Sequence, residues 1–304
     1  MKNKPIIIVA GEPNSIFLEI FFKSIKSKKF KNPIILICSL NLLKLQMNKL
    51  KFKKKIELIN FHKLNMTKLN NKTINLIDVK YNQKNEFKKI SKKSKNYIKK
   101  SFDVAFKIIK RGLSDKLING PISKKHFLDK KFLGITEYIS KEFASKNEVM
   151  LIYNKKISVS PITTHLPIKT VSKNINKKLI YKKIKIINNF YKNYFKYIPR
   201  IAVTGLNPHC ESNLKKNEDK QIIEPSIKKL RKEGLKIYGP YAADTIFLKK
   251  NRELFDVIVG MYHDQVLGPL KTLYEYDAIN ITLGLPFIRI SPDHGPNEIM
   301  IGKN

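Results

Sequence analysis

Two short runs of β-branched residues near the amino terminus limit the folds open to this chain. PIIIVA (5–10) and NPIILICS (32–39) are apolar runs bounded by Pro, Gly, Asn or Ser, a pattern typical of strands buried on both faces. The stretch between them, SIFLEIFFKSIKS, carries apolar residues at helical spacing. Strand, helix and strand in this order form a βαβ unit, which predicts a parallel α/β architecture.

The same pattern returns later in the chain. We expect strands at KIELIN and INLIDV, and a helix over 178–198 that ends before Pro199. PRIAVTGLNPH and ELFDVIVGMYHDQ both resemble a strand that runs into a polar loop. Ligands bind outside the carboxyl ends of strands in open α/β sheets, so these loops are the first places to look for chemistry.

The composition permits a folded enzyme and gives little support to a nucleic-acid partner. With 304 residues, 42% of them hydrophobic, the chain can bury one large core or two moderate ones. The formal charge of +37 would attract polyanions. However, only five of the 61 basic residues are Arg, and the Lys residues are spread through every segment. Because proteins that read nucleic acid favour the Arg fork, we interpret the charge as a solvated Lys-rich surface.

Cysteine content and the amino terminus indicate a cytoplasmic protein. Cys38 and Cys210 are too few for a disulfide scaffold and form no C-x-x-C pair, which favours a reducing compartment. The apolar run in MKNKPIIIVAGEPNS is too short for a signal peptide core or a membrane span.

Three of the six histidines follow apolar strand-like runs: His165, His209 and His263. Three imidazoles that converge from different strands would suit a divalent metal and leave positions open for substrate oxygens. A structural or surface role for each histidine is the competing interpretation. Asp264 could orient His263 from behind, or could face the substrate as an acid or base if both residues continue the strand.

A second group of polar residues is cationic and lies towards the carboxyl terminus. Lys271, Asn280 and Arg289 accompany the apolar run INITLGLPFIRIS. A buried Arg289 needs an anionic or polar partner. That partner is either a carboxylate or phosphate of the substrate or a local carboxylate such as Asp293. Neither G-x-G-x-x-G nor G-x-x-x-x-G-K-[ST] occurs, so a nucleotide would bind by another route.

Taken together, these segments resemble the 4-hydroxythreonine-4-phosphate dehydrogenase family of vitamin B6 (pyridoxine) biosynthesis. The blocks that carry the resemblance are GEP (11–13), NGPISK (119–124), GITEYIS (134–140), TTHLP (163–167), GLNPH (205–209), GPYAADTIF (239–247), MYHDQ (261–265) and INITLGLPFIRISPDHG (279–295).

The resemblance implies a fold and an assembly. The family is similar to the isocitrate and isopropylmalate dehydrogenases, with two α/β domains around a cleft. It forms a homodimer with the active site near the interface and binds NAD without a Rossmann fingerprint. We therefore expect a first domain over residues 1–135 plus about 265–304, and a second domain, with the metal ligands, over 136–264.

The resemblance also assigns the site. His165, His209 and His263 fall on the family's three metal ligands, with metal binding shared across the dimer. Thr136, Lys271, Asn280 and Arg289 fall on substrate-binding positions. Asp244 and Asp264 fall on acidic residues near the reacting carbon, where we expect catalytic roles. The expected cofactors are NAD, with NADP as the alternative, and a divalent metal such as Zn, Mg, Co or Mn.

The implied reaction is an oxidative decarboxylation. NAD would oxidise 4-phosphohydroxy-L-threonine, and the resulting β-keto acid would lose carbon dioxide to give 3-amino-2-oxopropyl phosphate. Two alternatives stay open: a dehydrogenase for a threonate or erythronate phosphate, and a degraded homologue that binds phosphorylated ligands without turnover.

Three departures from the family bear on these alternatives. Ile135 stands where the family has His, which removes an expected substrate contact. Residues 14–18 (NSIFL) replace a small, Gly-rich sequence. The sequence also stops soon after Gly295, where family members continue through a closing helix, so we expect an exposed apolar patch there.

Overall fold

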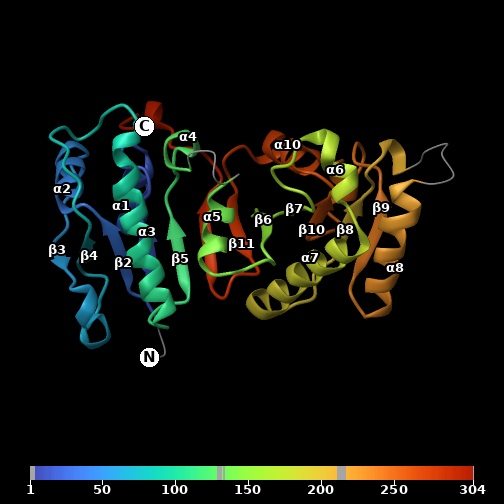
Figure 1. Cartoon of the computed structure of the whole chain (residues 1–304), viewed down its shortest axis with the longest axis horizontal. Helices are drawn as coiled ribbons and strands as arrows, with labels where there is room; N and C mark the ends of the chain where they lie inside the picture. Colours follow the sequence, from blue (N-terminus) through green and yellow to red (C-terminus); the bar gives the residue numbers. More distant parts are fainter. Residues whose placement is uncertain (1–3, 129–131, 133, 211–216, 304) are drawn as a thin grey trace. The chain divides into compact units, whose positions relative to one another are not determined.

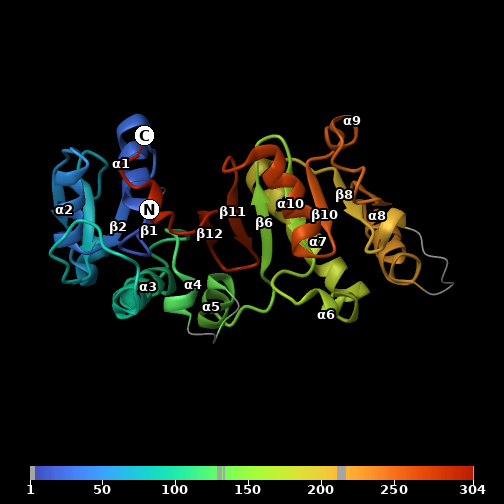
Figure 2. The same cartoon turned by 90° about the horizontal axis from the view of Figure 1, so that it is seen from above.

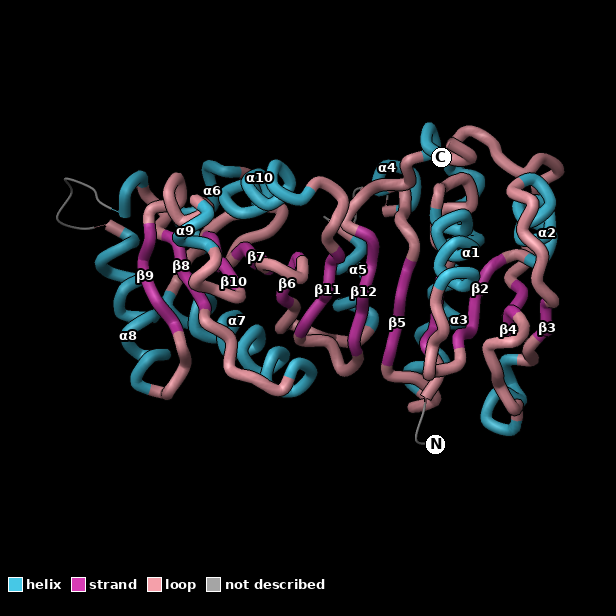
Figure 3. Tube along the Cα trace, turned by 180° about the vertical axis from the view of Figure 1, so that it is seen from behind, coloured by secondary structure: helices cyan, strands magenta, loops and turns pink. Residues whose placement is uncertain are grey.

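The computed structural model describes residues 4–128, 132, 134–210 and 217–303 (Figure 1). The chain divides into two compact units: unit 1 is Met1–Tyr138 with Pro286–Asn304, and unit 2 is Ile139–Leu285. Figure 3, in which strands are magenta and helices cyan, shows both kinds of element in each unit. The predicted α/β class is thus confirmed.

Unit 1 is built on parallel strands in the order β3-β4-β2-β1-β5-β12. Its strands are Ile6–Val9 (β1), Ile34–Cys38 (β2), Ile56–Leu58 (β3), Ile74–Asp78 (β4), Lys116–Asn119 (β5) and Ile288–Pro292 (β12). Its helices are Phe17–Ser27 (α1), Leu40–Lys49 (α2), Lys95–Lys110 (α3) and Lys124–Phe127 (α4), and α5 (Ile135–Glu142) begins in it. The βαβ start and the strands at KIELIN and INLIDV are confirmed.

Helices cover both faces of the unit 1 sheet. Figure 2 shows α1 and α3 on opposite sides of β1 and β2. α1 buries Phe17, Phe21 and Phe22 against these strands. Each such side chain contributes roughly 1.5–3 kcal/mol by leaving water, and coverage on both faces explains why the strands are apolar throughout.

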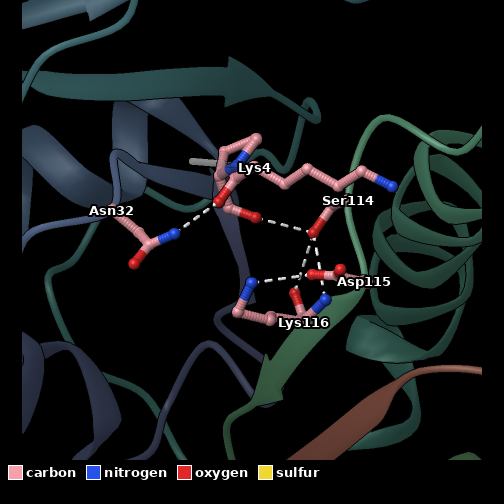
Figure 4. Close-up of polar contacts among 6 residues, drawn as sticks. Lys4, Asn32, Ser114, Asp115 and Lys116 are labelled. Atoms are coloured by element: carbon pink, nitrogen blue, oxygen red, sulfur yellow. Dashed lines mark hydrogen bonds and ion pairs between the residues drawn. The ribbon is translucent and has the colours of Figure 1, made fainter. Parts of the chain in front are cut away.

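Side-chain hydrogen bonds connect the loops at the amino-terminal edge of this sheet (Figure 4). Asn32 Nδ2 donates to the carbonyl oxygen of Lys4 (2.9 Å), and Ser114 Oγ donates to that of Pro5 (2.7 Å). The loops that precede β2 and β5 are therefore both attached to the start of β1.

Unit 2 has strands in the order β11-β6-β7-β10-β8-β9. They are Val149–Tyr153 (β6), Ser158–Pro161 (β7), Ile201–Thr204 (β8), Ile237–Tyr241 (β9), Val257–Gly260 (β10) and Ile279–Leu283 (β11). Its helices are Ile168–Asn174 (α6), Lys177–Phe190 (α7), Glu224–Lys232 (α8), Lys249–Arg252 (α9) and His263–Tyr274 (α10). The helix expected over 178–198 is confirmed as α7, followed by a π-helical turn over Tyr191–Phe195.

The predicted parallel arrangement does not extend to every strand of unit 2. β7, β10, β8 and β9 pair in parallel, but β6 pairs antiparallel with both β7 and β11. Only residues 154–157 connect β6 to β7. So short a connection can join antiparallel strands, whereas parallel strands need a long crossover.

The run INITLGLPFIRIS forms two strands in different units. Gly284, at φ +81°, turns the chain between β11 and β12, and the boundary between units follows at residue 285. The predicted division, with its second domain ending at 264, differs from these units at α10 and β11. α10 packs on β7 and β10, and β11 pairs with β6, so both elements lie in unit 2.

In the part of the chain that the structure describes, no helix combines the length and apolar character needed to cross a membrane.

Candidate functional site

Unit 1 buries an arginine whose side chain reaches the last residue of β5. Arg289 lies on β12, beside β5, and is fully buried. Its Nε donates to Asn119 Oδ1 (2.8 Å), and its Nη1 donates to Thr136 Oγ1 (3.4 Å). Asn119 is the last residue of β5, and Thr136 lies in the first turn of α5. The structure thus brings together two predicted substrate-binding residues, Thr136 and Arg289, and adds Asn119.

The electrostatics of Arg289 favour a charged partner. Burial lowers the pKa of the guanidinium from 12.5 to about 10, and the nearby carboxylate of Glu137 opposes this shift. The side chain therefore remains a cation at neutral pH. Because a buried cation is stabilised by an anion, this group suits a carboxylate or phosphate ligand.

Glu12 is a buried carboxyl group to which the sequence interpretation gave no role. It lies in the loop after β1, where its backbone N–H donates to the carbonyl oxygen of Pro121 (2.9 Å). Ser94 Oγ donates to Glu12 Oε2 (3.0 Å). Burial raises the pKa of Glu12 from 4.5 to about 7 despite that hydrogen bond. A group that can exchange a proton near neutral pH thus lies at the carboxyl-terminal edge of the unit 1 sheet, the edge at which Asn119 also lies.

This pKa makes the stability of the protein pH-dependent. The folded-state pKa exceeds the unfolded value, so between roughly pH 4.5 and 7 the folded protein keeps a proton that the unfolded chain has lost. We expect stability to fall as pH rises through this window, by about 3 kcal/mol from this group. Glu12→Gln should remove that loss, measured by urea unfolding at several pH values, whereas Glu253→Gln, at an exposed site, should retain it. An unchanged pH profile in Glu12→Gln would contradict the assignment.

In unit 2, two of the predicted metal ligands lie side by side. His165 follows β7 and His263 begins α10, directly after β10. The two imidazole ring centroids are 5.7 Å apart. β7 and β10 are parallel neighbours, and their pairing continues past the strand ends because Ile162 N–H donates to Gly260 O (2.7 Å). Thr163 then donates to the carbonyl oxygen of Met261 through both its N–H and its hydroxyl. These bonds hold the two segments that follow β7 and β10 side by side as they approach the histidines.

Asp264 lies beside His263. Of the two alternatives for Asp264, the one in which both residues continue a strand is wrong, because β10 ends at Gly260 and a helix begins at His263. Asp264 Oδ1 lies 2.6 Å from His263 Nδ1. A carboxylate oxygen at this distance accepts from an imidazole N–H, so the contact suits the tautomer with its proton on Nδ1. This is how a carboxylate orients a metal-ligating imidazole.

His209 occupies a loop after β8, held in place by buried polar groups. Asp219, fully buried, accepts from the backbone N–H of Leu206 (2.7 Å) and from Asn207 Nδ2 (2.7 Å). His209 adopts the left-handed backbone conformation (φ +57°), which non-glycine residues rarely adopt outside constrained sites. Its Nδ1 lies 3.8 Å from Asp244 Oδ2.

The donor chemistry of these residues fits a divalent metal. His165 and His263 supply two neighbouring imidazoles, and His209 lies in the loop after β8, the strand that pairs with β10. Within the described residues of a single chain, however, no three His, Cys, Asp or Glu side chains cluster closely enough to hold an ion. The structure therefore brings two of the three predicted ligands together, and the third lies beside Asp244.

The two remaining predicted substrate residues are also in unit 2. Lys271 lies on α10, with its Nζ 5.9 Å from the centre of the Tyr276 ring. Asn280 lies on β11, and its buried Oδ1 has no hydrogen-bond partner among the described residues. The predicted site residues are therefore divided between the units, with Thr136 and Arg289 in unit 1 and the others in unit 2.

These features define a class of protein. Parallel strands in both units lead to titratable or cationic side chains at their carboxyl ends, where α/β enzymes bind ligands. The fold is that of the isocitrate and isopropylmalate dehydrogenase class. A family profile described as "Pyridoxal phosphate biosynthetic protein PdxA" matches residues 18–304, and the chain belongs to this family of oxidoreductases.

Similar proteins agree with that membership. The chain is 41% identical over 235 residues to a 4-hydroxythreonine-4-phosphate dehydrogenase from Sulfurihydrogenibium sp. (strain YO3AOP1), a match that covers 76% of this chain and 71% of that protein. It is 35% identical over 203 residues to a D-threonate 4-phosphate dehydrogenase from Pectobacterium atrosepticum, covering 64% and 62%. The solved structure of 4-hydroxythreonine-4-phosphate dehydrogenase from Klebsiella pneumoniae has a TM-score of 0.80 at 27% identity, covering 98% and 93%.

Proposed function

We propose that the chain is an NAD- and divalent-metal-dependent dehydrogenase acting on 4-phosphohydroxy-L-threonine in vitamin B6 biosynthesis. Oxidation of the hydroxyl would give a β-keto acid, whose decarboxylation yields 3-amino-2-oxopropyl phosphate. The observation that carries the proposal is the pair of imidazoles, His165 and His263, at adjoining strand ends in a member of this family.

His165, His209 and His263 would hold the metal. When bound, it would supply Lewis acidity towards the oxygens of the substrate. Asp264, whose Oδ1 lies 2.6 Å from His263 Nδ1, would hold this imidazole in the tautomer that leaves Nε2 available as a ligand. Because one chain brings only two of these imidazoles together, we further propose a homodimer in which metal binding is shared between subunits.

The other residues would bind the substrate and move its proton. Arg289, held by Asn119 and Thr136, would bind one anionic end of the substrate with a preoriented guanidinium. Lys271 and Asn280 would contribute further polar contacts. Asp244 and Asp264 are the candidate proton acceptors for the hydroxyl as hydride passes to NAD.

Metal-restored turnover is the test of this function. The purified protein is treated with a chelator, and NADH formation from 4-phosphohydroxy-L-threonine is followed before and after adding each of Zn, Mg, Co and Mn. We expect activity to disappear with the chelator and return with at least one metal. A folded protein that produces no NADH with any of them would contradict the proposal and favour the non-catalytic homologue.

A phosphorylated sugar acid is the second candidate substrate. The relative from Pectobacterium atrosepticum is named for D-threonate 4-phosphate, and Ile135 replaces a histidine that the family resemblance places against substrate. A higher kcat/KM for threonate or erythronate phosphate than for the amino acid would favour this candidate.

Restoring the missing imidazole should separate the two candidates. Ile135 is half-buried at the start of α5, next to Thr136. A regained hydrogen bond to substrate contributes roughly 1–3 kcal/mol, so Ile135→His should raise kcat/KM for 4-phosphohydroxy-L-threonine about tenfold. Ile135→Gln, which is polar but has no imidazole, serves as the control. A lower kcat/KM in Ile135→His, with an unchanged fold, would mean that Ile135 matches the substrate this chain uses.

A further inference from the structure

We propose that Gln265 is a positioning residue, which holds the loop carrying His209 in place relative to His165 and His263. The inference rests on the function proposed above, because it concerns the residues that would hold the metal. The three histidines follow three neighbouring parallel strands, in the order β7, β10 and β8. Gln265 lies in the first turn of α10, and its side chain is buried.

The strands β8 and β10 stop pairing before the chain reaches the histidines. Their last paired residues are Val203 and Val259. Continued for two residues, the same register places Gly205 opposite Met261. The two segments that lead from these strands to the histidines therefore need a link other than the strand ladder.

The side-chain amide of Gln265 supplies this link. Its Oε1 accepts from the backbone N–H of Met261 (2.7 Å), and its Nε2 donates to the carbonyl oxygen of Gly205 (2.8 Å). Because one partner is a donor and the other is an acceptor, these contacts determine the orientation of the amide. The hydroxyl of Thr204 donates to the same Oε1 (2.9 Å). The amide thus bridges the two strand ends in the way that a peptide group would.

Met261 connects this amide bridge to the third segment. Its carbonyl oxygen accepts from the N–H of Thr163 (3.1 Å) and from the Thr163 hydroxyl (2.8 Å). Thr163 lies two residues before His165, and Met261 lies two residues before His263. The N–H of Met261 therefore joins its segment to the amide bridge, and its carbonyl group joins the same segment to the one that follows β7.

The loop that carries His209 is fixed again directly after the amide bridge. Asp219, which is fully buried, accepts from the backbone N–H of Leu206 (2.7 Å) and of Asn207 (3.3 Å). A Cβ atom at Gly205 would lie 2.7 Å from Asp219 Oδ1, so the close approach of this carboxylate requires glycine there. Because consecutive residues from Gly205 onward are held in this way, a shift at the amide bridge moves the chain that leads to the imidazole.

Packing alone does not require an amide at this position. The other buried residues of α10 are apolar: Val266, Leu267 and Leu270. A buried amide needs a partner for each of its polar atoms, whereas an apolar side chain needs none. The partners of Gln265 all lie within five residues before a histidine. The hydrogen bonds of this amide therefore serve the histidine loops.

Co²⁺ affinity in the absence of substrate tests this role separately from turnover. It is measured by titration, followed through the visible absorption of the bound ion. Gln265→Met keeps the length of the side chain but removes the amide bridge, and we expect affinity to fall about tenfold or more. Gln265→Glu keeps acceptor atoms for Met261 and Thr204 but places an acceptor against the carbonyl oxygen of Gly205. It should also weaken binding, and it carries the test if Gln265→Met does not fold.

Tyr191→Phe is the control for a purely structural loss. Tyr191 Oη donates to Ser158 Oγ (2.9 Å), a buried hydrogen bond at the first residue of β7, away from the histidines. Urea unfolding should show lower stability in this variant and in both Gln265 variants, but Co²⁺ affinity should fall only in the latter. In a His209→Ala background, Gln265→Met should cause little further loss, because the amide bridge acts through that imidazole.

Three results would overturn the proposal. One is wild-type Co²⁺ affinity in a folded Gln265→Met or Gln265→Glu protein. Another is an equal loss of affinity in Tyr191→Phe, and the third is a loss from Gln265→Met that is as large in the His209→Ala background as without it. In each case, a wild-type protein that binds Co²⁺ and forms NADH leaves the proposed function standing. Wild-type Co²⁺ affinity no higher than that of His209→Ala would instead contradict the proposed metal site, and this inference with it.

Discussion

The His209→Ala variant is expected to lose at least about 100-fold in kcat and to retain less bound divalent metal while keeping its fold. The His209 side chain is 72% exposed, so its truncation creates no cavity and leaves no buried group without a partner. An effect on activity would then come from lost metal binding. The measurements are NADH formation, metal content by mass spectrometry and thermal unfolding of the same preparations.

His62→Ala is the matched control for this experiment. His62 is an exposed histidine in the 3₁₀ helix Phe61–Met66 of unit 1, far along the chain from any predicted ligand. Its removal should leave both kcat and metal content at wild-type values. Normal kcat with full metal content in His209→Ala would rule out His209 as a ligand, whatever the control shows.

Apolar runs predicted the elements of the fold better than their directions. PIIIVA and NPIILICS predicted β1 and β2 because strands covered on both faces must be apolar throughout. The same argument fails for β6, since a buried antiparallel strand has the same composition as a parallel one. The four residues between β6 and β7 determine the direction. INITLGLPFIRIS was treated as one apolar run, yet the turn at Gly284 divides it between the units.

The site residues that could be predicted from the sequence are those that closely follow an apolar strand. His165 and His263 were selected because each follows an apolar run, and pairing of β7 with β10 brings their rings together. The alternative in which Asp264 continues a strand could not be excluded from the sequence, because polar residues after a strand look the same whether a strand, a loop or a helix follows. Asn119 and Glu12 received no role because their importance depends on burial and on partners distant in sequence. Asn119 begins the block NGPISK, and Glu12 follows the first strand, so both positions carried a usable signal.

Substitution of Arg289 by Met is expected to lower kcat/KM by about 100-fold or more. Arg289 is a fully buried cation, and Met preserves much of its length without its charge. Asn119 Oδ1 would lose its 2.8 Å donor, so a loss of about 1–3 kcal/mol in stability should accompany the change. Steady-state kinetics with varied substrate, together with urea unfolding, separates the two effects.

Arg289→Lys distinguishes charge from geometry. Lys retains the positive charge but lacks the planar fork that donates to Asn119 and Thr136 at once. If the substrate's anionic end is bound by charge alone, Arg289→Lys should recover most of the activity that Arg289→Met loses; if preorientation matters, it should recover only a small part. Arg111→Met, at an exposed position on unit 1, controls for the substitution itself. Wild-type kcat/KM in a folded Arg289→Met protein would show that the substrate does not depend on this cation, and Arg289 would then be a structural residue of the unit 1 sheet.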